Sequence, residues 1–185
     1  MTENEDYIVE CITKWVWSGF YEAAQIREMM DDILEPDCEV SRLEAFLESE
    51  FQRKVVAESS WPAETDCDRL DRVFHSLHEE GICALSNAGY TMSDGDSDVA
   101  EVVGEAPKGH YHGYCFYHGQ DVERALEGNG VMIAFGDLAN DKERSSAVGH
   151  RVTALLSAAG FEVSWDGSVA KRIDIPAFDW KRRHA

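Results

Sequence analysis

The residue types that can do chemistry gather between positions 110 and 121. His110, His112 and His118 carry imidazoles, and Asp121 follows the last of them by three residues. Imidazole and carboxylate are ordinary ligands of zinc and other transition metals. Alternation along a strand would put the three histidines on one face, leaving an open position for a catalytic metal. Because this spacing matches no established metal motif, the three histidines are only weak metal candidates.

A structural interpretation fits the same segment. A helical pattern runs from about Gln120 to Glu127, so His118 and Asp121 stand at its start. A carboxylate is favoured there by N-capping and by the helix dipole, and His110 and His112 would then lie in a solvated loop. Both interpretations stay open, with no catalytic residue assigned and no cofactor implied. The candidate site is the set Tyr117, His118, Gln120 and Asp121.

Two further patterns have a chemical and a plain interpretation. Asp94, Asp96 and Asp98, with Glu105 after them, have the acid spacing of a calcium loop. That loop needs glycine at its sixth position, where Val99 stands, so an exposed and flexible acidic loop over 91–108 is favoured. Cys115 lies between two histidines, as a Cys-His nucleophile would, but a buried strand cysteine is favoured.

Composition excludes several classes of protein. The net charge is −19, with 36 Asp and Glu against 17 Lys and Arg, which disfavours direct binding to nucleic acid or to anionic membranes. No apolar run reaches the 18–20 residues or so that span a bilayer. The N-terminus lacks the positive region of a signal peptide. Five dispersed cysteines without a Cys-x-x-Cys pair indicate reduced thiols, so we expect a cytoplasmic protein.

The excess charge is uneven along the chain. Residues 1–110 hold 26 acids and eight bases, whereas residues 111–185 hold ten acids and nine bases. Complementary charge steers association, so the acidic part predicts contact with a basic protein surface, in the extreme form as a mimic of DNA. The plain alternative is a solubility device. The basic tail 181–183 either pairs with the acidic helices or is a solvated terminus.

Apolar spacings of three and four predict helices over most of residues 6–80. Ser41, with Glu44 three residues later, predicts the start of one helix by a capping box, and Gly81 predicts the end of the last. We expect an acidic helical extension over 1–64 and an α/β domain over 65–185.

After Gly81 the pattern changes to short apolar runs that predict strands. Asp166-Gly167 predicts a turn that joins the last two strands as an antiparallel hairpin. Helical patterns lie between the strands over 120–127 and from about Ser145 to Gly160. The expected fold is α+β: N-terminal acidic helices followed by a mixed β-sheet of about five strands with packed helices. The five strand segments are 82–87, 113–118, 130–136, 161–165 and 171–176.

Three sequence blocks follow in order along the second part of the chain. They are Gly81-Ile82 with Asn87-Ala88-Gly89-Tyr90-Thr91, then Tyr117-His118-Gly119-Gln120-Asp121 with Ala134-Phe135-Gly136, then Val163-Ser164-Trp165-Asp166-Gly167 with Arg172-Ile173. This order resembles a family of uncharacterised bacterial proteins that share a domain of unknown function. The resemblance covers roughly residues 65–183, treats the N-terminal helices as a variable extension, and implies no activity.

These observations favour an acidic, non-enzymatic interaction or accessory protein with a basic protein partner. The alternative is a small enzyme or ligand-binding domain that uses a site centred on His118 and Asp121, with or without a metal. Whether the protein is an enzyme, and its oligomeric state, stay open.

Overall fold

The structure is a computed structural model that describes residues 2–184. Its chain divides into two compact units. The helical unit comprises residues 1–65 together with 181–185, and the sheet unit comprises residues 66–180. Among the residues described, no helix is both long enough and apolar enough to cross a membrane.

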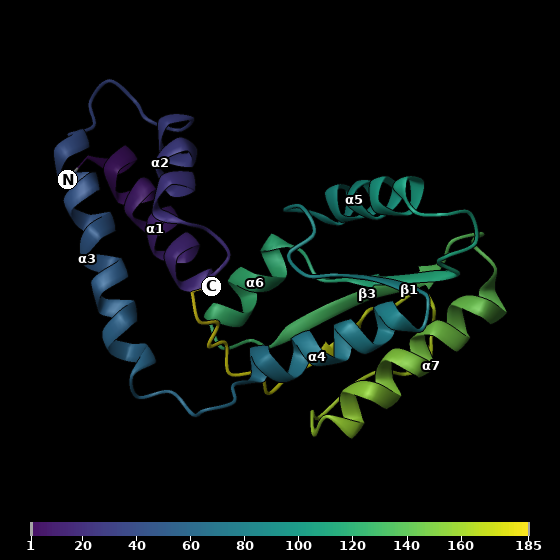
Figure 1. Cartoon of the computed structure of the whole chain (residues 1–185). Helices are drawn as coiled ribbons and strands as arrows, with labels where there is room; N and C mark the ends of the chain where they lie inside the picture. The colour runs from purple at the N-terminus through teal and green to yellow at the C-terminus, as the bar shows by residue number, and fades with distance from the viewer. Residues whose placement is uncertain (1, 185) are drawn as a thin grey trace. The chain divides into compact units, whose positions relative to one another are not determined.

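The helical unit is built on three helices, α1 (Glu3–Ser18), α2 (Ala23–Asp31) and α3 (Val40–Glu58). Helix α1 contacts both of the others, and Figure 1 shows the three helices packed together. The spacing of Ile8, Ile12 and Val16 places all three on one face, because residues four apart lie over each other on a helix. The buried core consists of these residues with Ile26, Met30, Leu43 and Leu47.

The start of α3 differs from the prediction. The helix begins at Val40 with Glu39 as its N-cap, not at Ser41. The reason is tertiary: the buried carboxylate of Glu5 accepts the backbone N–H of Glu39 at 2.8 Å and a hydrogen bond from Arg42 at 2.9 Å. A contact between segments 34 residues apart, which local spacing does not encode, therefore sets this helix start.

The basic C-terminal tail belongs to the helical unit. The guanidinium of Arg182 lies 4.5 Å from the ring centre of Phe20, and Arg183 donates to the carbonyl of Pro62. His184 Nε2 lies 3.2 Å from a carboxylate oxygen of Glu22. Of the two interpretations of the tail, association with the acidic helices is the one that the structure shows.

The sheet unit contains a mixed four-stranded sheet in the order β1-β2-β3-β4. Strand β1 (Ile82–Leu85) pairs parallel with β2 (Gly113–Phe116). The next two pairings, to β3 (Val131–Asp137) and then to β4 (Ile173–Ile175), are antiparallel. The α+β class and the mixed sheet are confirmed, with four strands in place of about five.

The missing strand is the segment 161–165. It makes only an isolated antiparallel bridge, between Ser164 and Asp174. The turn that follows is held by its own hydrogen bonds: Ser168 N–H donates to Asp166 at 3.0 Å, and Trp165 Nε1 donates to the Ser168 carbonyl at 3.0 Å. Those local bonds hold the loop away from a regular ladder, so the predicted hairpin is reduced to one bridge.

Helices cover both faces of the sheet. Helices α4 (Asp66–Glu79) and α7 (Lys142–Ala158) lie on one face and α5 (Met92–Glu105) on the other, as Figure 1 shows. Side chains alternate along a strand. Phe116 therefore faces the core under α5, whereas Gly113, three residues earlier on the strand, faces Val148 of α7. Helix α6 (Gly119–Leu126) connects β2 to β3.

Helix α5 corrects the prediction of a flexible acidic loop. Thr91 and Asp94 form a capping box at its start, and Val99 is buried in the core beneath it. Gly95 allows the close approach, since a Cβ there would lie 2.3 Å from the ring of Phe116. The aspartates of this segment therefore lie on a helix, which does not have the backbone shape of a calcium loop.

Candidate functional site

His118 and Asp121 lie where β2 ends and α6 begins. His118 is the N-cap residue, and its backbone N–H donates to Asp121 Oδ2 at 3.2 Å. The first free N–H groups of α6 donate to loop carbonyls: Gly119 to Gly89 at 2.9 Å and Gln120 to Tyr90 at 3.2 Å. The capping contact that the structural interpretation expects is thus present, and the helix end is covered by the loop after β1.

Arg172 completes this cluster. It stands immediately before β4, and its Nη1 lies 2.9 Å from each carboxylate oxygen of Asp121 and 3.1 Å from His118 Nε2. Sequence reasoning missed this residue as part of the site. Fifty-one positions separate Arg172 from Asp121, and only its place in a sequence block near the turn marked it.

The hydrogen bonds assign the protonation of His118. Arginine is only a donor, so Nε2 of His118 accepts and the ring proton resides on Nδ1. Nδ1 lies 3.2 Å from Asp121 Oδ2, is buried, and makes no hydrogen bond of good geometry among the described residues. Burial lowers the pKa of His118, with Arg172 acting in the same direction and Asp121 opposing it. The imidazole is therefore neutral at neutral pH.

The pKa of Asp121 is shifted in the opposite direction. Burial raises the pKa of its carboxyl above the ordinary value, while Arg172 and His118 pull it down. His118 and Asp121 are each 2% exposed, whereas the side chain of Arg172 is 29% exposed. The cluster is thus a buried ion pair with a neutral histidine, and it ties the start of α6 to the start of β4.

Solvent reaches this cluster through Arg172. The arginine lines a hollow of about 470 Å³, together with Met132, Trp165 and Asp174. The acceptor lone pair of His118 is directed at Arg172, so His118 can take a proton from a bound molecule only after Arg172 moves. As it stands, the arrangement can recognise a ligand through Arg172 and holds no free general base.

The other two candidate site residues lie apart from this cluster. Tyr117 is a core residue, with its ring 5.5 Å from that of Phe74 and 5.9 Å from that of Trp180. Gln120 is exposed on the first turn of α6. The structure therefore brings together His118 and Asp121 of the predicted set, and adds Arg172.

The three histidines proposed as metal ligands do not meet. His110 and His112 precede β2, which begins only at Gly113, whereas His118 follows the other end of that strand. Among residues 2–184, no three His, Cys, Asp or Glu side chains are placed to hold a metal ion. Cys115 is completely buried on β2, and burial raises the pKa of its thiol, which disfavours a nucleophilic thiolate.

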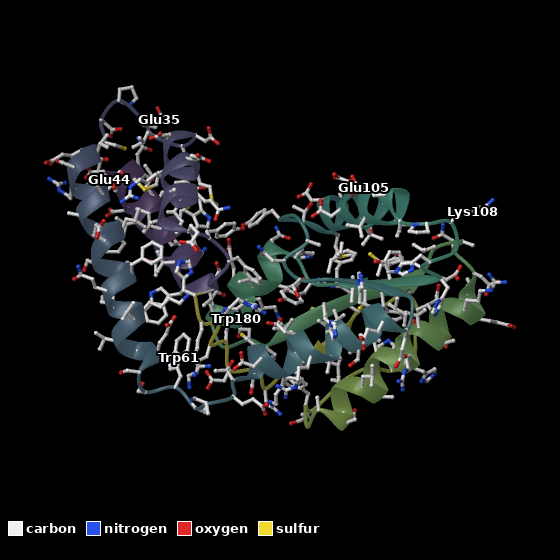
Figure 2. All side chains as sticks on the ribbon, in the orientation of Figure 1. Glu35, Glu44, Trp61, Glu105, Lys108 and Trp180 are labelled. Carbon is white, nitrogen blue, oxygen red and sulfur yellow. The ribbon has the colours of Figure 1, made fainter. Side chains whose placement is uncertain are left out.

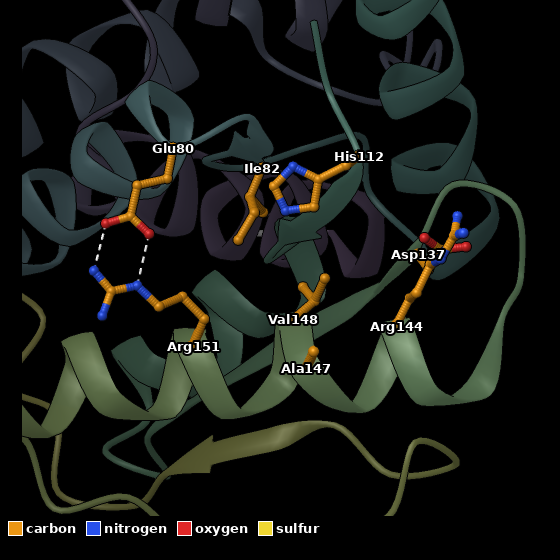
Figure 3. Close-up of a pocket in the computed structure, with 8 residues that line it drawn as sticks. All are labelled: Glu80, Ile82, His112, Asp137, Arg144, Ala147, Val148 and Arg151. Atoms are coloured by element: carbon orange, nitrogen blue, oxygen red, sulfur yellow. Dashed lines mark hydrogen bonds and ion pairs between the residues drawn. The ribbon is translucent and has the colours of Figure 1, made fainter. Parts of the chain in front are cut away.

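A second hollow lies at the opposite end of β2. It has a volume of about 360 Å³ and is drawn in Figure 3. Arg151 of α7 donates to Glu80 through two nitrogens, with Nε at 2.6 Å, and Arg144 stands two turns earlier on the same helix. Of the candidate residues named from the sequence, His112 lines this hollow, and nothing in the sequence pointed to Arg144 or Arg151. Its remaining lining residues are Ile82, His112, Asp137, Ala147 and Val148.

The negative charge extends over both units. The helical unit has 16 acids and eight bases, because the basic tail returns to it, and carries a net charge of −8. The sheet unit has 20 acids and nine bases and carries −11. The charge is therefore not a property of the N-terminal helices alone.

The fold and its buried cluster define a two-unit α+β protein with a neutral histidine held in an Asp–Arg ion pair. The chain belongs to the family described as Domain of unknown function (DUF6891), whose model matches residues 1–184. That match includes the N-terminal helices, so the expectation that the family resemblance begins near residue 65 was wrong. No curated protein and no solved structure matches the chain.

Proposed function

We propose that this protein is a non-enzymatic, cytoplasmic interaction protein whose acidic surface binds a basic protein partner. The observation that carries the proposal is a line of carboxylates on α5. Asp94, Asp98, Glu101 and Glu105 follow one another at intervals of four, three and four residues, so they lie along one side of the helix. At 1.5 Å per residue the line is about 16 Å long.

The line has no counter-charge of its own. Helix α5 contains five acids and no Lys or Arg, and Asp98, Glu101 and Glu105 form no ion pair with any described residue. Figure 2 labels Glu105 on the outward side of α5, with Lys108 in the loop after it. Like charges at these spacings destabilise a helix by roughly 0.2–0.5 kcal/mol per pair. A single lysine on this side of α5 would relieve the repulsion. Its absence supports the view that the carboxylates serve a contact outside the fold.

A surface rich in Lys and Arg is the matching partner, since complementary charge speeds encounter and fixes orientation. Such binding weakens with salt, because the Debye length is about 10 Å at 0.1 M and about 3 Å at 1 M. Nucleic acid would instead be repelled by the same carboxylates.

The test compares two variants that change the net charge equally. The α5 variant carries Asp98→Asn, Glu101→Gln and Glu105→Gln. The control carries Asp31→Asn, Asp32→Asn and Glu35→Gln, which are exposed in the helical unit. Tagged proteins are used to capture partners from lysate at low and at high salt, and the captured proteins are quantified by mass spectrometry.

We expect basic proteins to be enriched at low salt by the wild type and by the control, and lost with the α5 variant. Equal capture by all three proteins, or capture that resists high salt, would contradict the proposal. Loss with the control alone would move the contact to the helical unit.

A small-ligand site at Arg172 is the second candidate function. The buried Nδ1 of His118, which has no hydrogen-bond partner among the described residues, supports it. Metal analysis of protein purified without a histidine tag, and thermal melts with and without chelator, test the metal-dependent form. A chelator-sensitive melt that disappears in His118→Ala would favour this candidate over the interaction role.

A further inference from the structure

We propose that the hollow beside Arg144 binds a small carboxylate anion that has an apolar body. The first argument is the state of Arg144. Its guanidinium has no hydrogen-bond or ion-pair partner among residues 2–184, although the chain has 36 acids for 17 bases. A guanidinium presents a planar fork of donors that matches a carboxylate in a bidentate manner. The free cation at this hollow therefore has the geometry to receive one.

The second argument is the surface between the two arginines of α7. Arg144 and Arg151 are seven residues apart, so they stand about 10 Å apart along one side of the helix. Ala147 and Val148 lie between them, and Ile82 and His112 face them across the hollow, as Figure 3 shows. Arg151 is already paired with Glu80. An anion therefore meets one free guanidinium, with the aliphatic side chains available for its apolar part.

The third argument is Asp137, which limits the charge of the ligand. This buried carboxylate accepts the N–H groups of Ala139 at 2.8 Å and Asp141 at 3.1 Å, both through Oδ2. It holds the turn before α7. At the Arg144 end of the hollow its own negative charge disfavours a ligand that carries a second negative charge. A monoanion is thus preferred over a dianion such as a phosphate monoester. The volume of about 360 Å³ lies at the lower end of the roughly 300–1,000 Å³ of ligand pockets, which suits a small acid.

The experiment is a titration of ¹⁵N-labelled protein with 3-methylbutanoate, with its neutral amide, and with inorganic phosphate. We expect saturable shifts at the amides of Ile82, His112, Arg144 and Val148 with the carboxylate. The amide, which lacks the charge, should bind at least about tenfold more weakly, because a hydrogen bond to a charged group is stronger. Phosphate should shift these signals less than the carboxylate.

Arg144→Gln and Lys142→Gln make a matched pair of variants. Both remove one positive charge near the start of α7, and both residues are exposed, but only Arg144 lines the hollow. We expect Arg144→Gln to weaken carboxylate binding about tenfold, and Lys142→Gln to leave it within about twofold. The dispersion of each spectrum verifies that the variant is folded.

Four results would overturn the inference. They are the absence of saturable shifts, equal binding of the acid and its amide, equal loss in both variants, or a response to phosphate as strong as that to the carboxylate. Because the acidic line on α5 plays no part in this titration, these results are independent of the partner-binding role.

Discussion

Replacement of Asp121 by alanine removes the centre of the buried cluster. The carboxylate accepts the backbone N–H of His118 and two contacts from Arg172. Without it, the start of α6 loses its cap, and the guanidinium of Arg172 keeps the neutral His118 and sulfur contacts to Met92 and Met132. The variant therefore leaves a buried N–H without its acceptor and a partly buried positive charge without its carboxylate.

The size of the effect follows from these two losses. A lost N-terminal capping contact costs about 1 kcal/mol. Breaking a fully buried ion pair costs about 3–5 kcal/mol. Arg172 is 29% exposed, so water compensates part of that loss. For this pair we therefore take a smaller cost of about 1–2 kcal/mol, below the range for a fully buried pair. The expected loss in free energy of unfolding is about 2–3 kcal/mol in total.

Urea unfolding of the wild type and the variant measures this difference. An unchanged m-value indicates that the two proteins expose the same amount of surface on unfolding. Because the chain has two units, amide hydrogen exchange of β2 and β3 is recorded as well, to report on the sheet unit alone. Asp121→Asn keeps the shape and one acceptor oxygen, so its loss should be smaller than that of Asp121→Ala.

Asp94→Ala is the matched control. Asp94 occupies the same third position of a capping box, at the start of α5, where its partners are Thr91 and Tyr90 and no arginine. Its loss should be clearly smaller than that of Asp121→Ala. Equal losses in the two variants would show that Arg172 contributes nothing. An unchanged or increased stability of Asp121→Ala would refute the structural role and indicate a strained functional site.

Three further outcomes are expected. His118 has a lowered pKa in the folded state, so the unfolded state takes up the proton first. Wild type should therefore lose stability relative to His118→Asn as pH falls through 6.5, measured by urea unfolding at pH 5 to 8, and a pH-independent difference would contradict this. Asp121, with a raised pKa, acts in the opposite direction, over the pH range between its ordinary value of 3.8 and its raised pKa in the folded state. Deletion of residues 182–185 should lower the unfolding free energy of the helical unit by about 1–2 kcal/mol, because two cation–π contacts are lost. Unchanged hydrogen exchange in α1 would argue against this stabilising role of the tail. A thiol reagent at pH 8 should label Cys11 and Cys38 first, since the other three cysteines are buried and the pKa of Cys83 is raised to about 11. Peptide mapping locates the labelled residues, and early labelling of a buried cysteine would contradict the prediction.

Helix periodicity and strand runs were sufficient to predict most elements. Ile8, Ile12 and Val16 recur at helical spacing, and the run over 131–135 has the apolar character of a buried strand, because burial of one face or both imposes these patterns. The prediction of a flexible loop over 91–108 was wrong. It depended on the Gly and Asp residues of this segment, which are typical of loops. Its helix is stabilised by a capping box and by the fit of Gly95 against Phe116, and the second of these is a tertiary contact.

For the site, the sequence by itself determined the chemistry of His118 and Asp121 and their place before a helix, because capping is a local interaction over three residues. Only the tertiary structure decided that Arg172 contacts both of them and that His112 lies at the far end of β2. It also decided that Arg144 lines a hollow with its guanidinium unpaired among residues 2–184. These relations join positions tens of residues apart. They depend on strand order and on the packing of α7, which local periodicity does not specify.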